Sequence, residues 1–265
     1  MRPINDTPLV RDGKMLILAY DHGLEHGPVD FEDVPKSANP EHVFDVATHP
    51  AVTSLAVQKG LAEAYYPSYE DDVSLLAKLN GSTNLWMGEH DTAVNWSVDY
   101  AADVGADAIG FTMYAGSNHE VEIAEEFRQA QERARQHDMP VVMWSYPRGQ
   151  GVKSDRKPGV IAYAARQALE LGADVTKIKY PGSEEAMAHA VDVTGRTKVV
   201  MSGGSKRSDR EFLTQVKEVI DVGGDGLAVG RNVFQRDHPE RILDALEQVI
   251  FEESSVDTAL AAMER

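Results

Sequence analysis

Three side chains near the N-terminus have types and a spacing that could bind a metal ion. His22, Glu25 and His26 in "DHGLEHGP" form the pattern H-x-x-E-H. On a helix this pattern places both imidazoles on one face, where they can bind Zn²⁺ with the glutamate as base. Gly23 interrupts the pattern, and Gly27 and Pro28 follow it directly. Because these residues disfavour a helix, the segment is interpreted as a loop after a strand, and no metal or other cofactor is expected.

A second pair with possible chemistry is Lys177 and Lys179 in "TKIKYPG". In a strand these lysines share one face, while Ile178 takes the other. Buried lysines are costly without a partner or a function. Burial and a neighbouring like charge both lower a lysine pKa, which allows the amine to form a Schiff base with a carbonyl. Alternatively, both lysines only bind anions, or one of them lies in water beyond the rim of the barrel, and the residues alone leave these alternatives open.

The elements that must position these residues are short apolar runs that alternate with helical patterns, including 118–138, 159–172, 183–195 and 209–224. Strict alternation predicts a parallel sheet. Eight units in 265 residues favour a single (β/α)8 TIM barrel over an open doubly wound sheet. No G-x-G-x-x-G follows the first strand, which argues against dinucleotide binding.

The expected architecture is thus a single (β/α)8 barrel domain spanning residues 1–265, with a short C-terminal helical extension at 254–265. The eight expected strands are 15–21, 54–60, 83–89, 108–114, 140–147, 175–182, 198–204 and 226–232.

Active sites of such barrels lie at the C-terminal ends of the strands, and here those ends are polar or rich in glycine. Glycines after the last two strands let backbone N–H groups approach a phosphate closely, in the part of the barrel where phosphate usually binds. The expected phosphate-binding residues are Ser202, Gly203 and Gly204 of "SGGSK", and Gly230 and Arg231 of "VGRN".

The charge of the chain excludes some partners. There are 43 Asp plus Glu and 26 Lys plus Arg, a formal net charge of -17. Such a surface repels nucleic acid and anionic membranes, so neither is expected as a partner. The acidity also predicts a halophilic protein, since salt screens the self-repulsion of the surface. No Cys, signal-like N-terminus or apolar span is present, and a cytoplasmic location is expected.

Five separated segments together resemble one family. These are "ILAYDHGLEHGP", "WSYPRG", "GADVTKIKYPG", "VVMSGGSK" and "LAVGRNVFQ". In order and spacing they are similar to the archaeal-type class I fructose-1,6-bisphosphate aldolases, the DhnA-type aldolases, over residues 13 to 250. The resemblance implies a metal-independent (β/α)8 barrel, assembled as a homo-oligomer. It implies reversible cleavage of a phosphorylated sugar, fructose 1,6-bisphosphate, to dihydroxyacetone phosphate and glyceraldehyde 3-phosphate.

The resemblance also implies roles for individual residues. Lys177 would form the Schiff base, Tyr146 would be the general acid/base, and Asp21 would lie near the reacting hydroxyl groups. Lys179 would lower the Lys177 pKa or contact phosphate, and Arg148 is a candidate for the second phosphate. The remaining residues expected in the pocket are Trp144, beside Tyr146, and His22 and His26, which would hydrogen-bond substrate, although His26 could equally serve to fold the loop.

Two positions depart from the family pattern, since Pro181 stands where the family usually has Thr and Ser205 where it has Pro. Neither change removes a catalytic group. The nearest alternative is 2-amino-3,7-dideoxy-D-threo-hept-6-ulosonate synthase, a lysine-dependent enzyme that shares the "DHG", "YPRG" and "GGxK" elements. A phosphate-binding isomerase with a carboxylate base and a non-catalytic barrel are further alternatives, and neither would need an essential lysine.

Overall fold

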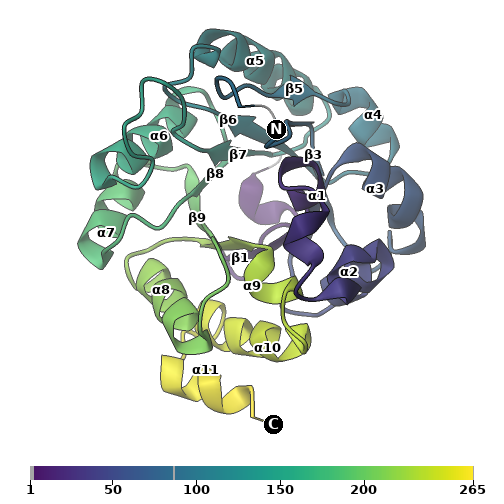
Figure 1. Ribbon diagram of the computed structural model, residues 1–265, viewed down its shortest axis with the longest axis vertical. Helices are drawn as coiled ribbons and strands as arrows, with labels where there is room; N and C mark the ends of the chain where they lie inside the picture. The colour runs from purple at the N-terminus through teal and green to yellow at the C-terminus, as the bar shows by residue number, and fades with distance from the viewer. Residues whose placement is uncertain (1–2, 86, 265) are drawn as a thin grey trace.

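The computed structural model describes residues 3–85 and 87–264. Eight strands in this described part form a closed parallel barrel with helices around it (Figure 1), which confirms the expected (β/α)8 fold. The order around the barrel is β1-β10-β9-β8-β7-β6-β3-β2. The barrel strands are β1 (Met15–Ala19), β2 (Ser54–Val57), β3 (Leu75–Lys78), β6 (Ala108–Met113), β7 (Val141–Ser145), β8 (Val175–Ile178), β9 (Lys198–Ser202) and β10 (Gly226–Val229).

The helices pack one apolar face against the barrel. In α10 (Pro239–Ile250), Ile242, Leu246 and Val249 are fully buried, at a spacing that places them on one helical face. Ser or Asn caps stabilise several helix starts, as where Ser208 Oγ accepts from Glu211 N. The other helices are α1 (His22–Glu25), α2 (Pro40–Ala47), α3 (Lys59–Tyr65), α4 (Val98–Asp103), α5 (Glu120–Gln136), α6 (Pro158–Glu170), α7 (Glu184–Asp192), α8 (Asp209–Asp221), α9 (Arg231–Phe234) and α11 (Val256–Ala262), with 3₁₀ helices η1 (Ile4–Asp6), η2 (Pro28–Phe31), η3 (Pro35–Ala38) and η4 (Tyr66–Ser68).

The third strand was predicted at the wrong place. The barrel strand is β3, whereas 83–89 belongs to the connection between the short antiparallel strands β4 (Asn80–Gly81) and β5 (Ala93–Val94), and its Trp86 lies outside the described residues. The apolar letters at 83–89 do not mark a buried strand, since Leu85 and Met87 are exposed. The true strand is short and ends in a lysine, which hid it from a search for apolar runs.

The predicted strands also extend too far at their C-terminal ends. Residues 59 and 60 of the predicted second strand already belong to α3, and β8 ends at Ile178, so Lys179 lies beyond it. The polar residues counted as strand ends are therefore mostly the first residues of the following loops. The predicted terminal extension is confirmed, since α11 packs on α8 and α10 at the outside of the barrel.

Three aspartates fix strand pairs at the N-terminal end of the barrel. Asp107, directly before β6, accepts from Leu75 N at 3.1 Å at the start of β3. Asp174, before β8, accepts from Val141 N at 2.8 Å, and Asp225, before β10, accepts from Val199 N at 2.8 Å. Each carboxylate satisfies an N–H group where a ladder begins, which stabilises the register of the strands.

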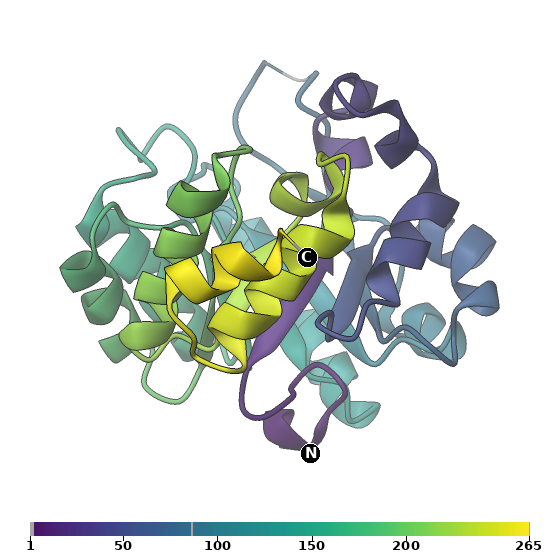
Figure 2. The ribbon, with the colours of Figure 1, turned by 90° about the horizontal axis from the view of Figure 1, so that it is seen from below.

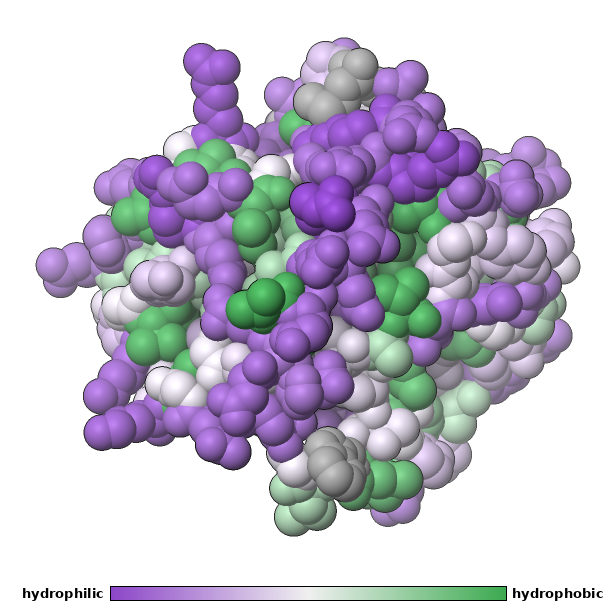
Figure 3. Space-filling model, turned by 90° about the horizontal axis from the view of Figure 1, so that it is seen from above, coloured by the Kyte–Doolittle hydropathy of each residue, from purple (hydrophilic) through white to green (hydrophobic). Residues whose placement is uncertain are grey.

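The opposite end of the barrel carries the longer connections. In Figure 2, β1 rises from the side of the N-terminus, and the segments after β1 and β3 project from the other end. Hydrophilic side chains cover much of the face in Figure 3, between separate hydrophobic patches. Within the described residues, no helix is both long and apolar enough to cross a membrane.

Candidate active site

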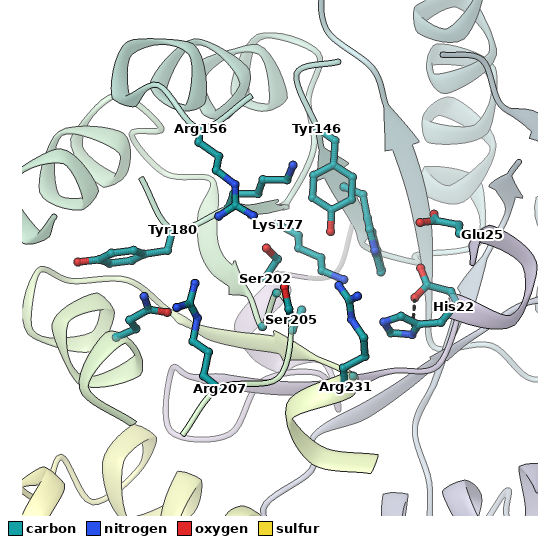
Figure 4. A pocket seen from close by; sticks show the side chains of 18 of the residues that line it. His22, Glu25, Tyr146, Arg156, Lys177, Tyr180, Ser202, Ser205, Arg207 and Arg231 are labelled. Atoms are coloured by element: carbon teal, nitrogen blue, oxygen red, sulfur yellow. Dashed lines mark ion pairs between the residues drawn. The ribbon is translucent and has the colours of Figure 1, made fainter. Parts of the chain in front are cut away.

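The residues expected to form the site meet in one cavity of 380 Å³ at the C-terminal ends of the strands (Figure 4). They lie on β7, β8 and β9 and in the segments that follow β1, β7, β8, β9 and β10. The cavity is lined by every site residue named from the sequence, namely Asp21, His22, His26, Trp144, Tyr146, Arg148, Lys177, Lys179, Ser202, Gly203, Gly204, Gly230 and Arg231.

Lys177 is buried in this cavity, with 5 % of its surface exposed. It pairs in register with Trp144 of the adjacent strand β7, and its Nζ lies 4.6 Å from the centre of the indole ring. Burial lowers the pKa of Lys177, against the opposing effect of the Asp21 and Glu25 carboxylates, and Arg231 lowers it further. A larger fraction of Lys177 is therefore the neutral amine that attacks carbonyl groups.

Tyr146 follows β7 and points into the same space as Lys177 in Figure 4. Burial raises the pKa of Tyr146, and Glu25 and Asp21 raise it further, while Arg148 acts in the opposite direction. The hydroxyl group therefore stays a phenol at neutral pH and can donate a proton.

Asp21 is a buried carboxylate that stays ionised. Burial on its own would raise the pKa of Asp21, but the positive charges of the nearby lysines, Lys177 first and then Lys78, hold it below its ordinary value. Asp21 Oδ1 lies 3.9 Å from His22 Nδ1. Burial lowers the pKa of His22 to about 4, so this imidazole is neutral at physiological pH.

The segment after Asp21 corrects the expected loop, because His22–Glu25 forms one helical turn. His26 lies 4.0 Å from the Glu25 carboxylate and 3.9 Å from Asp30. The two histidine rings are 5.8 Å apart, and no group of three or more potential ligands suited to a metal ion occurs among the residues that the structure describes.

The glycine-rich loops after β9 and β10 are held together by buried Asn232. Its Nδ2 donates to Gly203 O at 2.8 Å and to Ser205 O at 2.9 Å, and its Oδ1 accepts from Arg207 N at 2.9 Å. Position 230 requires glycine because the chain there passes close to His22, and a Cβ would lie 2.1 Å from His22 Cε1. The loops therefore have fixed positions beside the cavity.

Arg231 is available for an anionic ligand. Its guanidinium lies 3.8 Å from the Asp30 carboxylate, and its buried Nε has no hydrogen-bond partner within the described part of the chain. Buried donors are usually satisfied, so this N–H is suited to a ligand oxygen.

Lys179 has a carboxylate partner, since its Nζ donates to Asp155 Oδ2. Burial lowers the pKa of Lys179, and the hydrogen bond to Asp155 opposes this effect. Of the two roles suggested for Lys179, a change in the Lys177 pKa has less support, because the Asp155 carboxylate already balances the charge of Lys179.

Sequence reasoning missed three basic residues. Arg156 and Arg207 line the cavity from the loops after β7 and β9 (Figure 4), and a search for cations behind each strand would have found them. Lys78, fully buried at the end of β3, was missed because that strand was placed elsewhere.

Comparison with known proteins identifies the family of the chain. Residues 15–236 match the model of the DeoC/LacD family aldolases. The chain is 73% identical over 260 residues to a class 1 fructose-bisphosphate aldolase of Halobacterium salinarum, covering 98% of this chain and 99% of the relative. It is 46% identical over 242 residues to the class 1 fructose-bisphosphate aldolase of Thermoproteus tenax, covering 91% of each.

Among solved structures, a Schiff base forming fructose-1,6-bisphosphate aldolase superposes with a TM-score of 0.88 at 44% identity, covering 91% of this chain and 96% of the other. The family match, the two relatives and this superposition all extend over most of the barrel. The chain therefore belongs to the DeoC/LacD family of aldolases and, within it, to the class 1 fructose-bisphosphate aldolases.

Proposed function

We propose that this protein is a class I fructose-1,6-bisphosphate aldolase whose nucleophile is Lys177. The observation that carries the proposal is a buried lysine with a lowered pKa that shares one cavity with a buried phenol, Tyr146, and an ionised carboxylate, Asp21. These are the groups that Schiff-base cleavage of a carbon–carbon bond needs.

The first half of the reaction joins the substrate to the enzyme. The neutral amine of Lys177 attacks the ketose carbonyl carbon, and the electron pair of the C=O bond moves to oxygen, which takes a proton from Tyr146. Loss of that oxygen as water then gives an iminium ion. The iminium is an electron sink of the kind that a divalent metal supplies in other enzymes.

The second half breaks the carbon–carbon bond. A base, with Tyr146 or Asp21 as the candidates, removes the proton of the C4 hydroxyl group, and the C3–C4 electron pair moves to the iminium as an enamine while glyceraldehyde 3-phosphate leaves. Protonation of C3 and hydrolysis by one water release dihydroxyacetone phosphate and restore Lys177.

The phosphate groups would be held at two places. One phosphate would bind between the two glycine-rich loops, which offer backbone N–H groups and a guanidinium. These loops contain Ser202, Gly203 and Gly204 after β9, and Gly230 and Arg231 after β10. Arg148, with Lys179, is the candidate for the other phosphate, and His22 and His26 would hydrogen-bond the sugar.

Borohydride trapping tests the proposal. Dihydroxyacetone phosphate with borohydride should inactivate the enzyme and leave a mass adduct on Lys177 and not on Lys179. Lys177→Met should abolish cleavage while the circular dichroism of the barrel is kept, and chelators should not affect the wild-type rate. An adduct at Lys179 alone, or cleavage by Lys177→Met, would reject the assignment.

A second assay separates the alternative synthase. Transfer from 6-deoxy-5-ketofructose 1-phosphate, measured beside cleavage of fructose 1,6-bisphosphate, distinguishes the two lysine-dependent activities. We also infer that the enzyme works in the cytoplasm as a homo-oligomer, as the resemblance implies, and light scattering of the purified protein tests the assembly.

A further inference from the structure

A second lysine lies inside the barrel, at the C-terminal end of β3. Lys78 is fully buried, with 0 % of its surface exposed, and its backbone carbonyl accepts from Trp96 Nε1 at 2.8 Å. Lysine is seldom buried this completely without a partner or a function. The proposed nucleophile Lys177 does not explain why a second ammonium group is kept in the interior.

Asn80 holds the Lys78 ammonium group in one position. Lys78 Nζ donates to Asn80 Oδ1 at 3.0 Å and also to the Asn80 backbone oxygen. Asn80 is itself fixed to β6, because Thr112 N donates to its Oδ1 at 2.7 Å and its Nδ2 donates to Thr112 O at 2.9 Å. These partners orient Lys78 but are neutral, so they do not balance its charge.

Lys78 and Lys177 approach the same indole ring. Lys78 Nζ lies 5.5 Å from the centre of the Trp144 ring, and Lys177 Nζ lies 4.6 Å from it. Gly110 on β6 provides the space, since a Cβ there would lie 2.7 Å from Trp144 and 3.2 Å from Lys78 Cδ. Strand β6, next to β3, thus leaves room for the side chains of Trp144 and Lys78 beside each other.

The charges that act on Lys78 are those of the proposed active site. Burial, the largest effect, lowers the pKa of Lys78 to about 8, while Asp21 and Glu25 favour its charged form and Lys177 opposes it. Lys78 therefore remains largely protonated at neutral pH. The titratable and charged groups facing the two lysines are Asp21, His22 and Glu25 from the β1–α1 segment, Tyr146 from the end of β7, and Arg231 from α9.

We propose that Lys78 is a positioning residue for Schiff-base formation, whose fixed positive charge balances the buried Asp21 carboxylate so that Lys177 can release its proton. The inference rests on the proposed function of Lys177. Repulsion between two ammonium groups is mutual, so a charged Lys78 disfavours the charged form of Lys177. Without Lys78, Lys177 would be left as the lysine that neutralises Asp21 and would keep its proton to a higher pH.

The pH profile of Lys78→Met tests this role. The acid limb of kcat/KM should move upward by about one pH unit, so that kcat/KM falls about tenfold on that limb and recovers at alkaline pH. If Lys78 only holds Asn80 and the strand in place, Lys78→Met should lower kcat/KM by the same factor at every pH, and the acid limb should stay at its wild-type pH. That result would overturn the proposal. Lys179→Met, which also removes an ammonium group from the cavity, is the matched control and should not move the limb.

A chemical variant separates charge from packing. The chain has no Cys, so Lys78→Cys introduces a single thiol that can be alkylated in denaturant before refolding. Bromoethylamine restores an ammonium group, whereas iodoacetamide adds a neutral amide of similar length that still donates hydrogen bonds. The charged adduct should show the acid limb of kcat/KM at the wild-type pH, and the neutral adduct should show it at a higher pH. The same acid limb in both adducts would overturn the inference.

Trapping in the wild-type enzyme distinguishes the two proposals. If borohydride leaves no adduct on Lys177, the proposed function fails and the inference fails with it. If the adduct forms on Lys177 and the limb of Lys78→Met is unshifted, only the role of Lys78 is rejected.

Discussion

The guanidinium carbon of Arg148 lies 5.1 Å from the centre of the Tyr146 ring. Arg148 also approaches the Tyr114 ring, at 5.8 Å, so aromatic faces orient this cation. Contacts of this kind depend on the ring and not on the hydroxyl group. Tyr146→Phe therefore removes the proposed acid/base group while the contact that orients Arg148 is kept.

Tyr146→Phe should lower kcat by about 10²–10⁴-fold, the usual contribution of a positioned proton donor. KM should change little, because Arg148 keeps its aromatic neighbours. Steady-state kinetics with fructose 1,6-bisphosphate measures both quantities, with Tyr114→Phe as the control for loss of a nearby phenol. Near-normal kcat in Tyr146→Phe would move the acid/base role to Asp21 or Glu25.

The stability of the fold should depend on the protonation of His22. Burial lowers the pKa of this imidazole from 6.5 to about 4. Between these values the unfolded chain binds a proton that the folded chain does not, so stability falls as the pH drops through this window. The contribution lost between pH 7 and pH 5 is about 2 kcal/mol. Urea unfolding of the wild type and His22→Gln at both pH values measures it, and equal losses in the two proteins would contradict the prediction.

The aspartates at the N-terminal end of the barrel should contribute to stability but not to chemistry. Asp174 accepts from Val141 N and from Arg135, whose Nη1 lies 2.8 Å from Oδ2. Asp174→Ala leaves a strand N–H and a half-buried guanidinium without this partner, at a cost of about 1–3 kcal/mol. Urea unfolding measures the loss, and kcat of the folded variant should equal that of the wild type. A large fall in kcat at unchanged stability would show that this end of the barrel affects the site.

Salt should stabilise and activate the protein. With a formal net charge of -17, the folded chain repels itself in dilute buffer, and molar KCl shortens the Debye length to about 3 Å. The thermal midpoint and kcat should both rise between dilute buffer and molar KCl. Scanning calorimetry and aldolase assays across that range test this, and a constant or falling midpoint would reject the halophilic interpretation.

Patterns within the chain determined most of the fold and most of the cavity lining. The alternation of strand and helix predicted the closed barrel, and the position of Tyr146 and Lys177 at strand ends predicted that they meet. Such patterns work because local spacing decides which face of a strand a side chain takes, and parallel strands bring their C-terminal ends to one side. The prediction of the third strand was wrong because a four-residue strand that ends in lysine has too little apolar periodicity to be recognised.

Only the tertiary structure decided the electrostatics of the site. The sequence gives no distance between Lys78, Asp21 and Lys177, which come from strands far apart in the chain and are brought together when the barrel closes. A pKa depends on burial and on charges across space, so neither the neutral His22 nor the proposed balance between the two lysines can be inferred from neighbours along the chain. The sequence by itself therefore determined which groups are available, and closure of the barrel decided which of them carry a charge.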